Sequence, residues 1–389
     1  MTERVLKGIA WDHDRGYGCL AGTAAAFSAD HPDIRVEWSV RSLRDFGEGP
    51  LDTLADTYDL IIVDHPFSGH AKATGVLIDL RLHLSSEEIE ALENNSVGKS
   101  TVSYHYEGGI FGLPTDAAAQ IASYRPDLMT DLGAQVPQNH GEVLALAESA
   151  RAKGKRIATP ACPIDALCLV LTFAANLDHP LGPDEDRFIS PEILETVLGH
   201  VEELVAASDP RSIGWNPIQM YDEMAASDDI VYCPYAFGYS NYARKNRGKP
   251  ILAANIAGPG ADPHRGSLLG GAGCSVTRAC NDVDAAMTYL RWLHRPEFQA
   301  GAYFQAGGQP GLRNAWTDAG VNAQSNDFFA DSLETLDKAY LRPRWYGFLD
   351  FFEVAGKTVN ARLQGDLTRP ATIERLHQLY DKARSGHRA

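Results

Sequence analysis

The sequence has no run of about 20 apolar residues, which is the length that a membrane-spanning helix needs. Positive charge is also scarce, because 35 Lys and Arg side chains stand against 51 Asp and Glu side chains, for a formal net charge of −16. No segment rich in Lys or Arg offsets this charge, which disfavours binding to a phosphate backbone. We therefore expect a soluble protein that does not insert into a membrane and has no nucleic-acid partner.

The six cysteines form neither a C-x-x-C pair nor a dense framework. A chain of 389 residues can bury a sufficient core without disulfides, so buried thiols are the simplest interpretation. Their spacing does not support a zinc site, and His65 and His70 are spaced poorly for a metal without further ligands. We expect no metal and no cofactor.

Recognised catalytic motifs are missing as well. The chain contains no G-x-S-x-G, no P-loop, no H-E-x-x-H and no G-x-G-x-x-G after a strand. The glycine run 270–273 precedes a predicted strand and so does not indicate a dinucleotide site. No catalytic residue is assigned.

The N-terminal region alternates between strand and helix patterns. Residues 6–11, 34–38 and 58–64 read as strands, the last as an apolar run covered on both faces. Residues 22–31 and 51–55 lie between them and read as helices. This order predicts a parallel α/β sheet.

The C-terminal third carries a second set of signals. A glycine run at 270–273 leads into a strand, a helix follows over 284–298, and a Gly-Gly-Gln-Pro-Gly turn lies at 307–311. Residues 31–36 and 109–116 carry further motifs, His-Pro-Asp-Ile-Arg-Val and Gly-Ile-Phe-Gly-Leu-Pro-Thr-Asp. Taken in order, these segments resemble the family 1 extracellular solute-binding proteins, the ligand receptors of bacterial ABC importers.

The resemblance implies the type II periplasmic-binding-protein fold, an α/β fold of two lobes. Mixed central sheets flanked by helices would form each lobe, with a ligand cleft between the lobes that closes by hinge motion. Lobe 1 would comprise residues 1–115 and 258–312, and lobe 2 residues 116–257. Residues 313–389 would form helices that pack across the lobes, interrupted by an extended break at 341–345.

Within lobe 2, helix patterns cover residues 141–153, 165–175 and 191–207. Ser190 is a good N-cap for the third of these, because it precedes a proline in the first turn. Residues 230–235 read as a strand that runs into an aromatic segment.

Open α/β sheets bind ligands beyond the carboxyl ends of their strands, so the loops after the strands hold the candidate ligand-binding residues. After the first and third strands these are Trp11, Asp12, His13, Arg15, Tyr17, Asp64 and His65. Three positions in the first loop have a structural alternative: Trp11 can belong to the core, Asp12 or Asp14 can cap the next helix, and His13 can be a hydrogen-bonded structural histidine.

Other candidates follow from the resemblance. Asp116 matches an aspartate of the family's crossing between lobes, and an aromatic segment of lobe 2 matches a platform that can stack on the face of a sugar. The glycine pair would let the backbone approach the cleft, and an arginine after the turn could grip a carboxylate or form a surface salt bridge. These candidates are Asp116, Tyr235, Phe237, Tyr239, Gly270, Gly271 and Arg313, whereas Cys162, Asp165 and Trp215 are interpreted as structural.

Two functions are compatible with this pattern. The first is a solute-binding protein, with no chemistry of its own, that clamps a carbohydrate or a related polyhydroxylated or acidic metabolite and serves an ABC permease if exported. The alternative is a cytoplasmic enzyme or metabolite sensor that uses the Asp and His residues of the loops as acid and base. A signal peptide is missing at Met1, which favours the cytoplasm, unless the chain is a trimmed mature form of a periplasmic protein.

Overall fold

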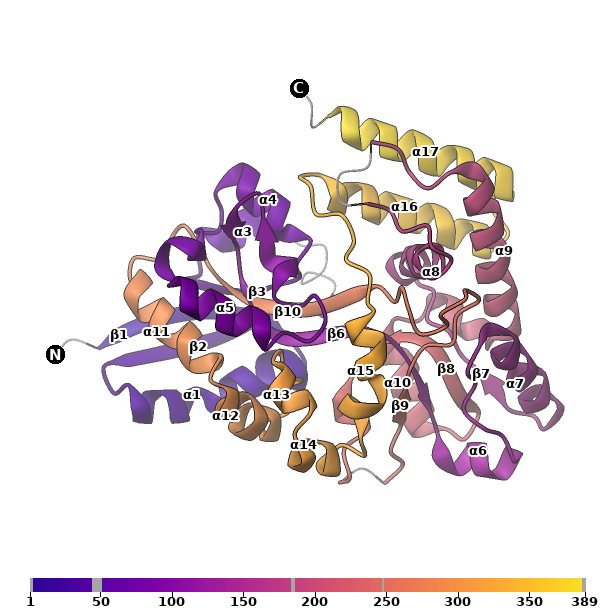
Figure 1. The fold of residues 1–389 in the computed structure, drawn as a ribbon, viewed down its shortest axis with the longest axis horizontal. Helices are drawn as coiled ribbons and strands as arrows, with labels where there is room; N and C mark the ends of the chain where they lie inside the picture. The colour runs from indigo at the N-terminus through magenta and orange to yellow at the C-terminus, as the bar shows by residue number, and fades with distance from the viewer. Residues whose placement is uncertain (1–2, 44–50, 183–185, 247, 387–389) are drawn as a thin grey trace. The chain divides into compact units, whose positions relative to one another are not determined.

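The computed structural model describes residues 3–43, 51–182, 186–246 and 248–386 (Figure 1). The chain divides into two compact units. Unit 1 comprises Met1–Ala117, Gly270–Val321 and Arg344–Tyr346, and unit 2 comprises Ala118–Leu269, Asn322–Pro343 and Gly347–Ala389. The lobe boundaries expected from the sequence stay a prediction.

The sheet of unit 1 has the strand order β2-β1-β3-β10. β1 (Arg4–Trp11) is parallel to both β2 (Ile34–Arg41) and β3 (Leu60–Val63), as the alternation of strands and helices predicts. All four residues of β3 are buried, which explains its continuous apolar sequence. β10 (Leu269–Val276) is antiparallel to β3, so the sheet is mixed.

The glycine run lies inside β10, not before it, which corrects the sequence-based boundary. Gly271 has a φ of 115°, a conformation that favours glycine. At Gly273, an added Cβ would lie 2.5 Å from the ring of Tyr104. The glycines are therefore required for the backbone conformation at Gly271 and for close packing at Gly273. The alternation of apolar and polar residues along a strand reveals neither requirement.

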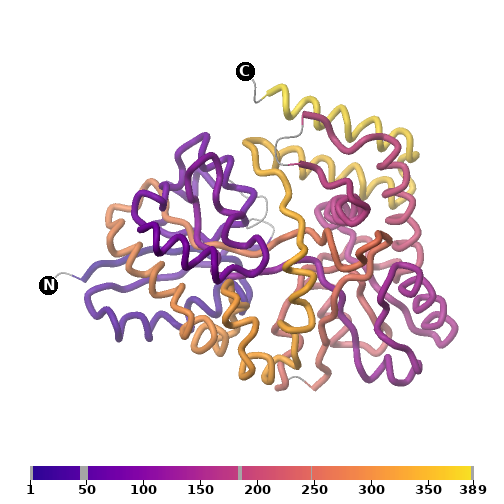
Figure 2. The backbone as a smooth tube through the Cα atoms, viewed as in Figure 1, coloured from indigo at the N-terminus to yellow at the C-terminus, as the bar shows by residue number. Residues whose placement is uncertain are grey.

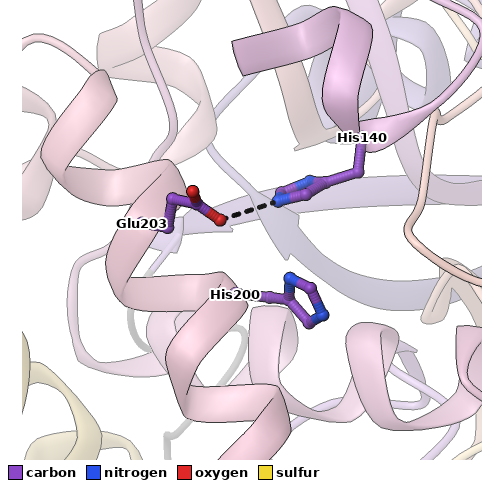
Figure 3. A group of neighbouring side chains, drawn as sticks. All are labelled: His140, His200 and Glu203. Atoms are coloured by element: carbon purple, nitrogen blue, oxygen red, sulfur yellow. Dashed lines mark ion pairs between the residues drawn. The ribbon is translucent and has the colours of Figure 1, made fainter.

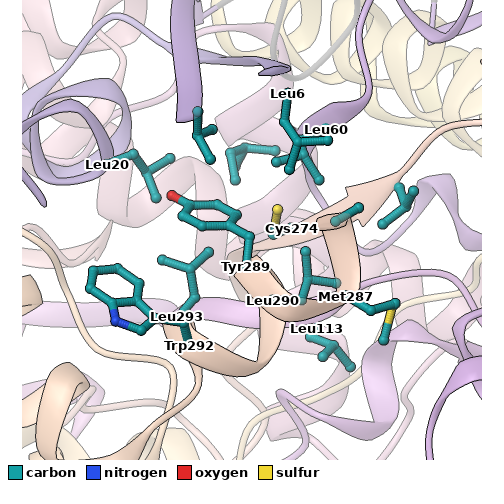
Figure 4. Packing of buried hydrophobic residues seen from close by; sticks show 14 of the residues in the cluster. Leu6, Leu20, Leu60, Leu113, Cys274, Met287, Tyr289, Leu290, Trp292 and Leu293 are labelled. Atoms are coloured by element: carbon teal, nitrogen blue, oxygen red, sulfur yellow. The ribbon is translucent and has the colours of Figure 1, made fainter. Parts of the chain in front are cut away.

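Helices from distant parts of the sequence pack on this sheet. Figure 2 shows the segment that carries α11 (Val283–Leu293) alongside the N-terminal strands. In Figure 4, Tyr289 and Leu290 of α11 pack against Leu6 and Cys274 of the sheet. Removing a buried aromatic side chain of this kind usually costs about 3–5 kcal/mol. The contact between these segments therefore makes a large contribution to the stability of unit 1.

The helix predicted over 284–298 is in fact two. α11 ends at Leu293, and α12 (Pro296–Phe298) begins with a proline at its first position. Proline cannot donate the backbone hydrogen bond that a continuous helix requires there, which explains the break. Other α-helices and strands of unit 1 are α1 (Cys19–Asp30), α3 (Leu51–Ala55), α4 (Phe67–Thr74), α5 (Ser86–Asn94), β4 (His105–Tyr106), β5 (Gly109–Ile110) and α13 (Arg313–Trp316).

The chain leaves unit 1 within β6 (Leu113–Tyr124), whose second half belongs to the sheet of unit 2. There β6 pairs antiparallel with β8 (Ile230–Phe237) and β9 (Leu252–Ala254), and β8 pairs parallel with β7 (Arg156–Ile157). Unit 2 thus also has a mixed sheet.

Unit 2 also contains several long helices. α9 spans Pro191–Ala207 as predicted, and Ser190 caps it by accepting a hydrogen bond from the backbone N–H of Ile193. α8 (Pro163–Asn176) contains the helix predicted over 165–175, and all of its residues from Asp165 onward are buried. The remaining helices are α6 (Pro126–Leu132), α7 (His140–Ala152), α10 (Pro217–Ala226), α15 (Phe328–Asp337), α16 (Phe348–Leu363) and α17 (Arg369–Ser385), and α14 (Ala319–Gln324) lies where the chain returns to unit 2.

The helices α16 and α17 lie side by side near α8 and α9 within unit 2 (Figure 1). Glu202 of α9 accepts hydrogen bonds from Arg362 and Arg369, both within 3.1 Å, and so ties α9 to the C-terminal part of the chain. Among the helices in the described parts of the chain, none has the length and apolar character of a membrane span.

Candidate functional site

The loop after β1 is built around His13. Its Nδ1 accepts a hydrogen bond from the backbone N–H of Arg15 at 3.0 Å, and its carbonyl accepts hydrogen bonds from Gly16 and Gly18. The result is the short π-helical turn η1 (Asp14–Gly18). His13, and not Asp12 or Asp14, therefore caps the segment that follows β1.

Trp11, at the end of β1, belongs to the hydrophobic core of unit 1. An added Cβ at Gly16 would lie 2.4 Å from the Trp11 ring, so the turn folds directly onto the indole. The surroundings of Trp11 therefore support the alternative that it is a core residue. Its role as a ligand contact stays a prediction.

Arg15 points from this turn to Asp116 of β6. Its Nε and Nη2 donate to the two carboxylate oxygens of Asp116, each at 2.5 Å. Both side chains are buried, with exposed fractions of 6% and 1%. Burial raises the pKa of Asp116 above its usual value, although the charge and hydrogen bonds of Arg15 oppose the rise. The sequence-predicted residues Arg15 and Asp116 are thus direct partners.

The Gly-Gly-Gln-Pro-Gly turn holds the β6 segment that carries Asp116. Asp116 and Pro310 form an antiparallel bridge, and the Gln309 side chain donates to the carbonyl of Ala117 at 2.9 Å. Only glycine fits at Gly311 without a shift, because an added Cβ would lie 2.1 Å from the carbonyl oxygen of Pro114. The two sequence motifs therefore form one structural element in unit 1.

A second pair of predicted residues follows β3. The Nδ1 of His65 lies 3.0 Å from a carboxylate oxygen of Asp64, and the His65 ring is buried edge-on against Tyr104. The Asp64 carboxylate remains partly exposed. Its negative charge contributes to the raised pKa of Asp116. Because β3 is parallel to β1, the residues that follow the two strands lie at the same end of the sheet. The structure thus brings Arg15, Asp64, His65 and Asp116 to one end of the sheet of unit 1.

The remaining predicted residues of unit 1 are less closely linked to this group. Asp12 is exposed, and Tyr17 is half-buried against the core. Gly270 and Gly271 lie in β10, as described above. Arg313 donates from Nε to the carbonyl of Ser96 at 2.8 Å, so part of its guanidinium holds a loop in place.

The aromatic residues predicted for unit 2 differ in exposure. Tyr235 is only 1% exposed and packs against Phe173 with a ring separation of 5.1 Å. Tyr239 packs edge-on against Tyr221 in the core. Phe237, at the end of β8, is the one of the three with a partly exposed side chain. It is therefore the best placed of them to contact a ligand.

At the start of α8, Cys162 and Asp165 form a polar pair. The Cys162 thiol donates to a carboxylate oxygen of Asp165 at 3.0 Å. Burial raises the pKa of Asp165 to about 7, so this carboxyl group titrates near neutral pH. The pair supports the structural interpretation, since each group serves as a partner for the other.

Residues 23–327 match the family model of bacterial extracellular solute-binding proteins. The chain belongs to this family. None of the curated proteins matches the solute-binding protein in sequence.

Solved structures resemble the solute-binding protein along its whole length. Maltose-bound MalE3 of T. maritima is 17% identical with a TM-score of 0.83, over 97% of this chain and 99% of that one. The GacH receptor of Streptomyces glaucescens, determined unliganded and with acarbose, is 16% identical with a TM-score of 0.81 over 100% of both chains. A ribitol-bound solute-binding protein of Agrobacterium radiobacter is 19% identical with a TM-score of 0.78, over 98% and 99%. These likenesses confirm the predicted two-lobed periplasmic-binding-protein fold.

The sequence did not indicate Tyr104, which supports the site of the solute-binding protein. Its hydroxyl donates to the carbonyl of Val63 at the end of β3, and its ring lies against His65. Added Cβ atoms at Gly112 and Gly273 would each lie within 3 Å of this ring. In the sequence, the glycines at these two positions are the signal that a large side chain packs nearby.

The group in unit 1 of the solute-binding protein is suited to hydrogen bonding. Carboxylates accept from hydroxyl groups, and Asp12 and Asp64 have carboxylates that reach solvent. Arg15 already bonds both oxygens of Asp116, so it holds that carboxylate in a fixed orientation. The three side chains that come together as a potential metal site in the described residues lie elsewhere, on α7 and α9.

Proposed function

We propose that this chain is a receptor that binds a carbohydrate or a related polyhydroxylated molecule and delivers it to the permease of an ABC importer. The observation that carries the proposal is the match of residues 23–327 to the extracellular solute-binding family. Structural relatives named for maltose and ribitol support the choice of ligand class.

The side chains of unit 1 support a polyhydroxylated ligand. Asp64 offers carboxylate oxygens at the end of β3, and a hydrogen bond from a ligand hydroxyl to a carboxylate is stronger than one between neutral groups. Asp12 offers a second carboxylate. In unit 2, the partly exposed ring of Phe237 has the apolar face on which the C–H face of a sugar can stack.

The proposal is tested by comparing two carboxylate variants. A thermal-shift screen against sugars, polyols and sugar acids first selects a ligand, whose affinity for Asp64→Asn is then measured by calorimetry. Loss of a charged hydrogen-bond acceptor should weaken binding by roughly 10- to 100-fold. Glu90→Gln is the matched control, because Glu90 is an exposed carboxylate of α5 in the same unit. Equal affinity of the two variants for the ligand would show that Asp64 does not contact it.

The same proposal includes the location of the protein outside the cytoplasm and the permease that it serves. The family is described as extracellular, and the cytoplasmic location expected from the sequence stays a prediction. Fractionation of the native host, followed by detection of the protein in the periplasmic or extracellular fraction, supports a transport role. Detection only in the cytoplasm contradicts transport and favours the sensor or enzyme alternative.

A further inference from the structure

Two histidines and a glutamate come together within unit 2, on helices that are distant in sequence (Figure 3). His140 is the first residue of α7, and His200 and Glu203 lie on α9. None of the three belongs to the candidate ligand site.

The distances within this cluster suit a metal ion. The Nε2 of His140 lies 3.7 Å from a carboxylate oxygen of Glu203, and one ligand atom from each of the three residues lies within 4.8 Å of the others. A tetrahedral zinc ion with ligand bonds of about 2.0–2.1 Å separates its ligand atoms by about 3.4 Å. Small side-chain rotations therefore close the site around an ion.

The surrounding structure holds the three side chains in place. His200 and Glu203 are three residues apart on one helix, so they project from the same face. Phe173 packs edge-on against His140, with ring centroids 5.5 Å apart, and is stacked on His200 at 6.2 Å. The Asn139 side chain caps α7 directly before His140 and fixes its backbone.

A second observation points to a ligand. His140 is only 6% exposed, and among the described residues neither of its ring nitrogens has a hydrogen-bond partner. The 3.7 Å separation from Glu203 is too long for a hydrogen bond. A buried polar group without a partner is costly, and metal coordination would satisfy one ring nitrogen.

We propose that His140, His200 and Glu203 form a binding site for a divalent transition-metal ion, with zinc as the best fit. Two imidazole nitrogens and one carboxylate oxygen are a ligand set that zinc accepts, and the fourth position is left for water. The Glu203 side chain is more than half exposed, which gives the ion a path from solvent. Bound metal would cross-link α7 to α9.

The test is a zinc titration of the metal-stripped protein at pH 7, monitored with a chromophoric chelator as competitor. We expect one saturable equivalent of zinc for the wild type and a visible spectrum of tetrahedral cobalt when Co²⁺ replaces it. Removing one ligand should weaken zinc binding by roughly 10-fold or more in His200→Ala and in Glu203→Gln. His179→Ala is the matched control, since His179 is an exposed histidine of the same unit, and it should bind as the wild type does.

Two results overturn the proposal. One is the absence of a saturable one-to-one site in the wild type, which decides the question even if a variant fails to fold. The other is equal zinc affinity of His200→Ala and His179→Ala. The titration contains no carbohydrate, so its outcome is independent of the proposed receptor function.

Discussion

Replacing Asp116 with asparagine should destabilise unit 1, because the change removes the negative charge that the buried Arg15 guanidinium contacts directly. The pair is bidentate at 2.5 Å, and its side chains are almost fully shielded from solvent. Asparagine keeps the shape of the aspartate but loses the charge. The effect therefore reports the electrostatic part of the interaction.

The expected magnitude follows from the burial of both partners. Removing one partner of a buried ion pair costs about 3–5 kcal/mol, much of it the penalty for the charge that remains. Replacing both partners by apolar residues, as in Arg15→Met with Asp116→Leu, removes that penalty. The double variant should therefore be less destabilised than the sum of the two single variants, by at least about 1 kcal/mol.

Urea denaturation of the wild type, the single variants Arg15→Met and Asp116→Leu, and the double variant measures this coupling, and Asp116→Asn is measured beside them. Intrinsic fluorescence follows unfolding, and circular dichroism checks that the transition is cooperative. Additive effects, with a coupling below about 0.5 kcal/mol, would refute the argument that Arg15 and Asp116 interact directly in a buried site.

Two further predictions concern pH and close packing. Partial burial would raise the pKa of Glu202, but hydrogen bonds from Arg369 and a second arginine lower it to about 2, below the reference value of 4.5. The stabilisation by ionised Glu202 is therefore present above pH 4.5 and is lost as the pH falls toward 2. Urea denaturation at pH 7 and pH 3 should show that the free energy of unfolding falls less in Glu202→Gln than in the wild type, by roughly 1–2 kcal/mol. An equal fall in both proteins counts against the ion-pair network. Gly311→Ala should lower the melting temperature by several degrees, because its Cβ would lie 2.1 Å from the carbonyl oxygen of Pro114. The control is Gly214→Ala, whose Cβ has open space, so its free energy of unfolding should stay within about 0.5 kcal/mol of the wild-type value. Similar melting temperatures for these two variants contradict the packing at Gly311.

Much of the fold could be predicted from local sequence signals. α9 begins and ends where its N-cap and apolar periodicity predict, and β3 is the buried strand that its apolar run indicates. Such elements depend on residues that are neighbours in the chain. Boundaries failed where a tertiary contact decides them, as at Gly273, whose glycine is required by a tyrosine ring from another segment.

The rule that ligands bind at the carboxyl ends of strands selected Arg15 and Asp64, and the parallel pairing of β1 with β3 places the residues after these two strands at one end of the sheet. Their roles as ligand contacts stay predictions. The sequence could not show that Arg15 would bond to Asp116, because 101 residues separate them. For the same reason, His140 and His200 did not suggest a metal site, since only the packing of α7 on α9 brings them together.

The most direct test of the receptor function is one equilibrium titration of the purified protein with the best ligand from the screen, followed by mass spectrometry of the recovered ligand. The account predicts saturable one-to-one binding of a sugar or polyol that is recovered unchanged. Conversion of the ligand, or binding only of a metabolite without several hydroxyl groups, would contradict it.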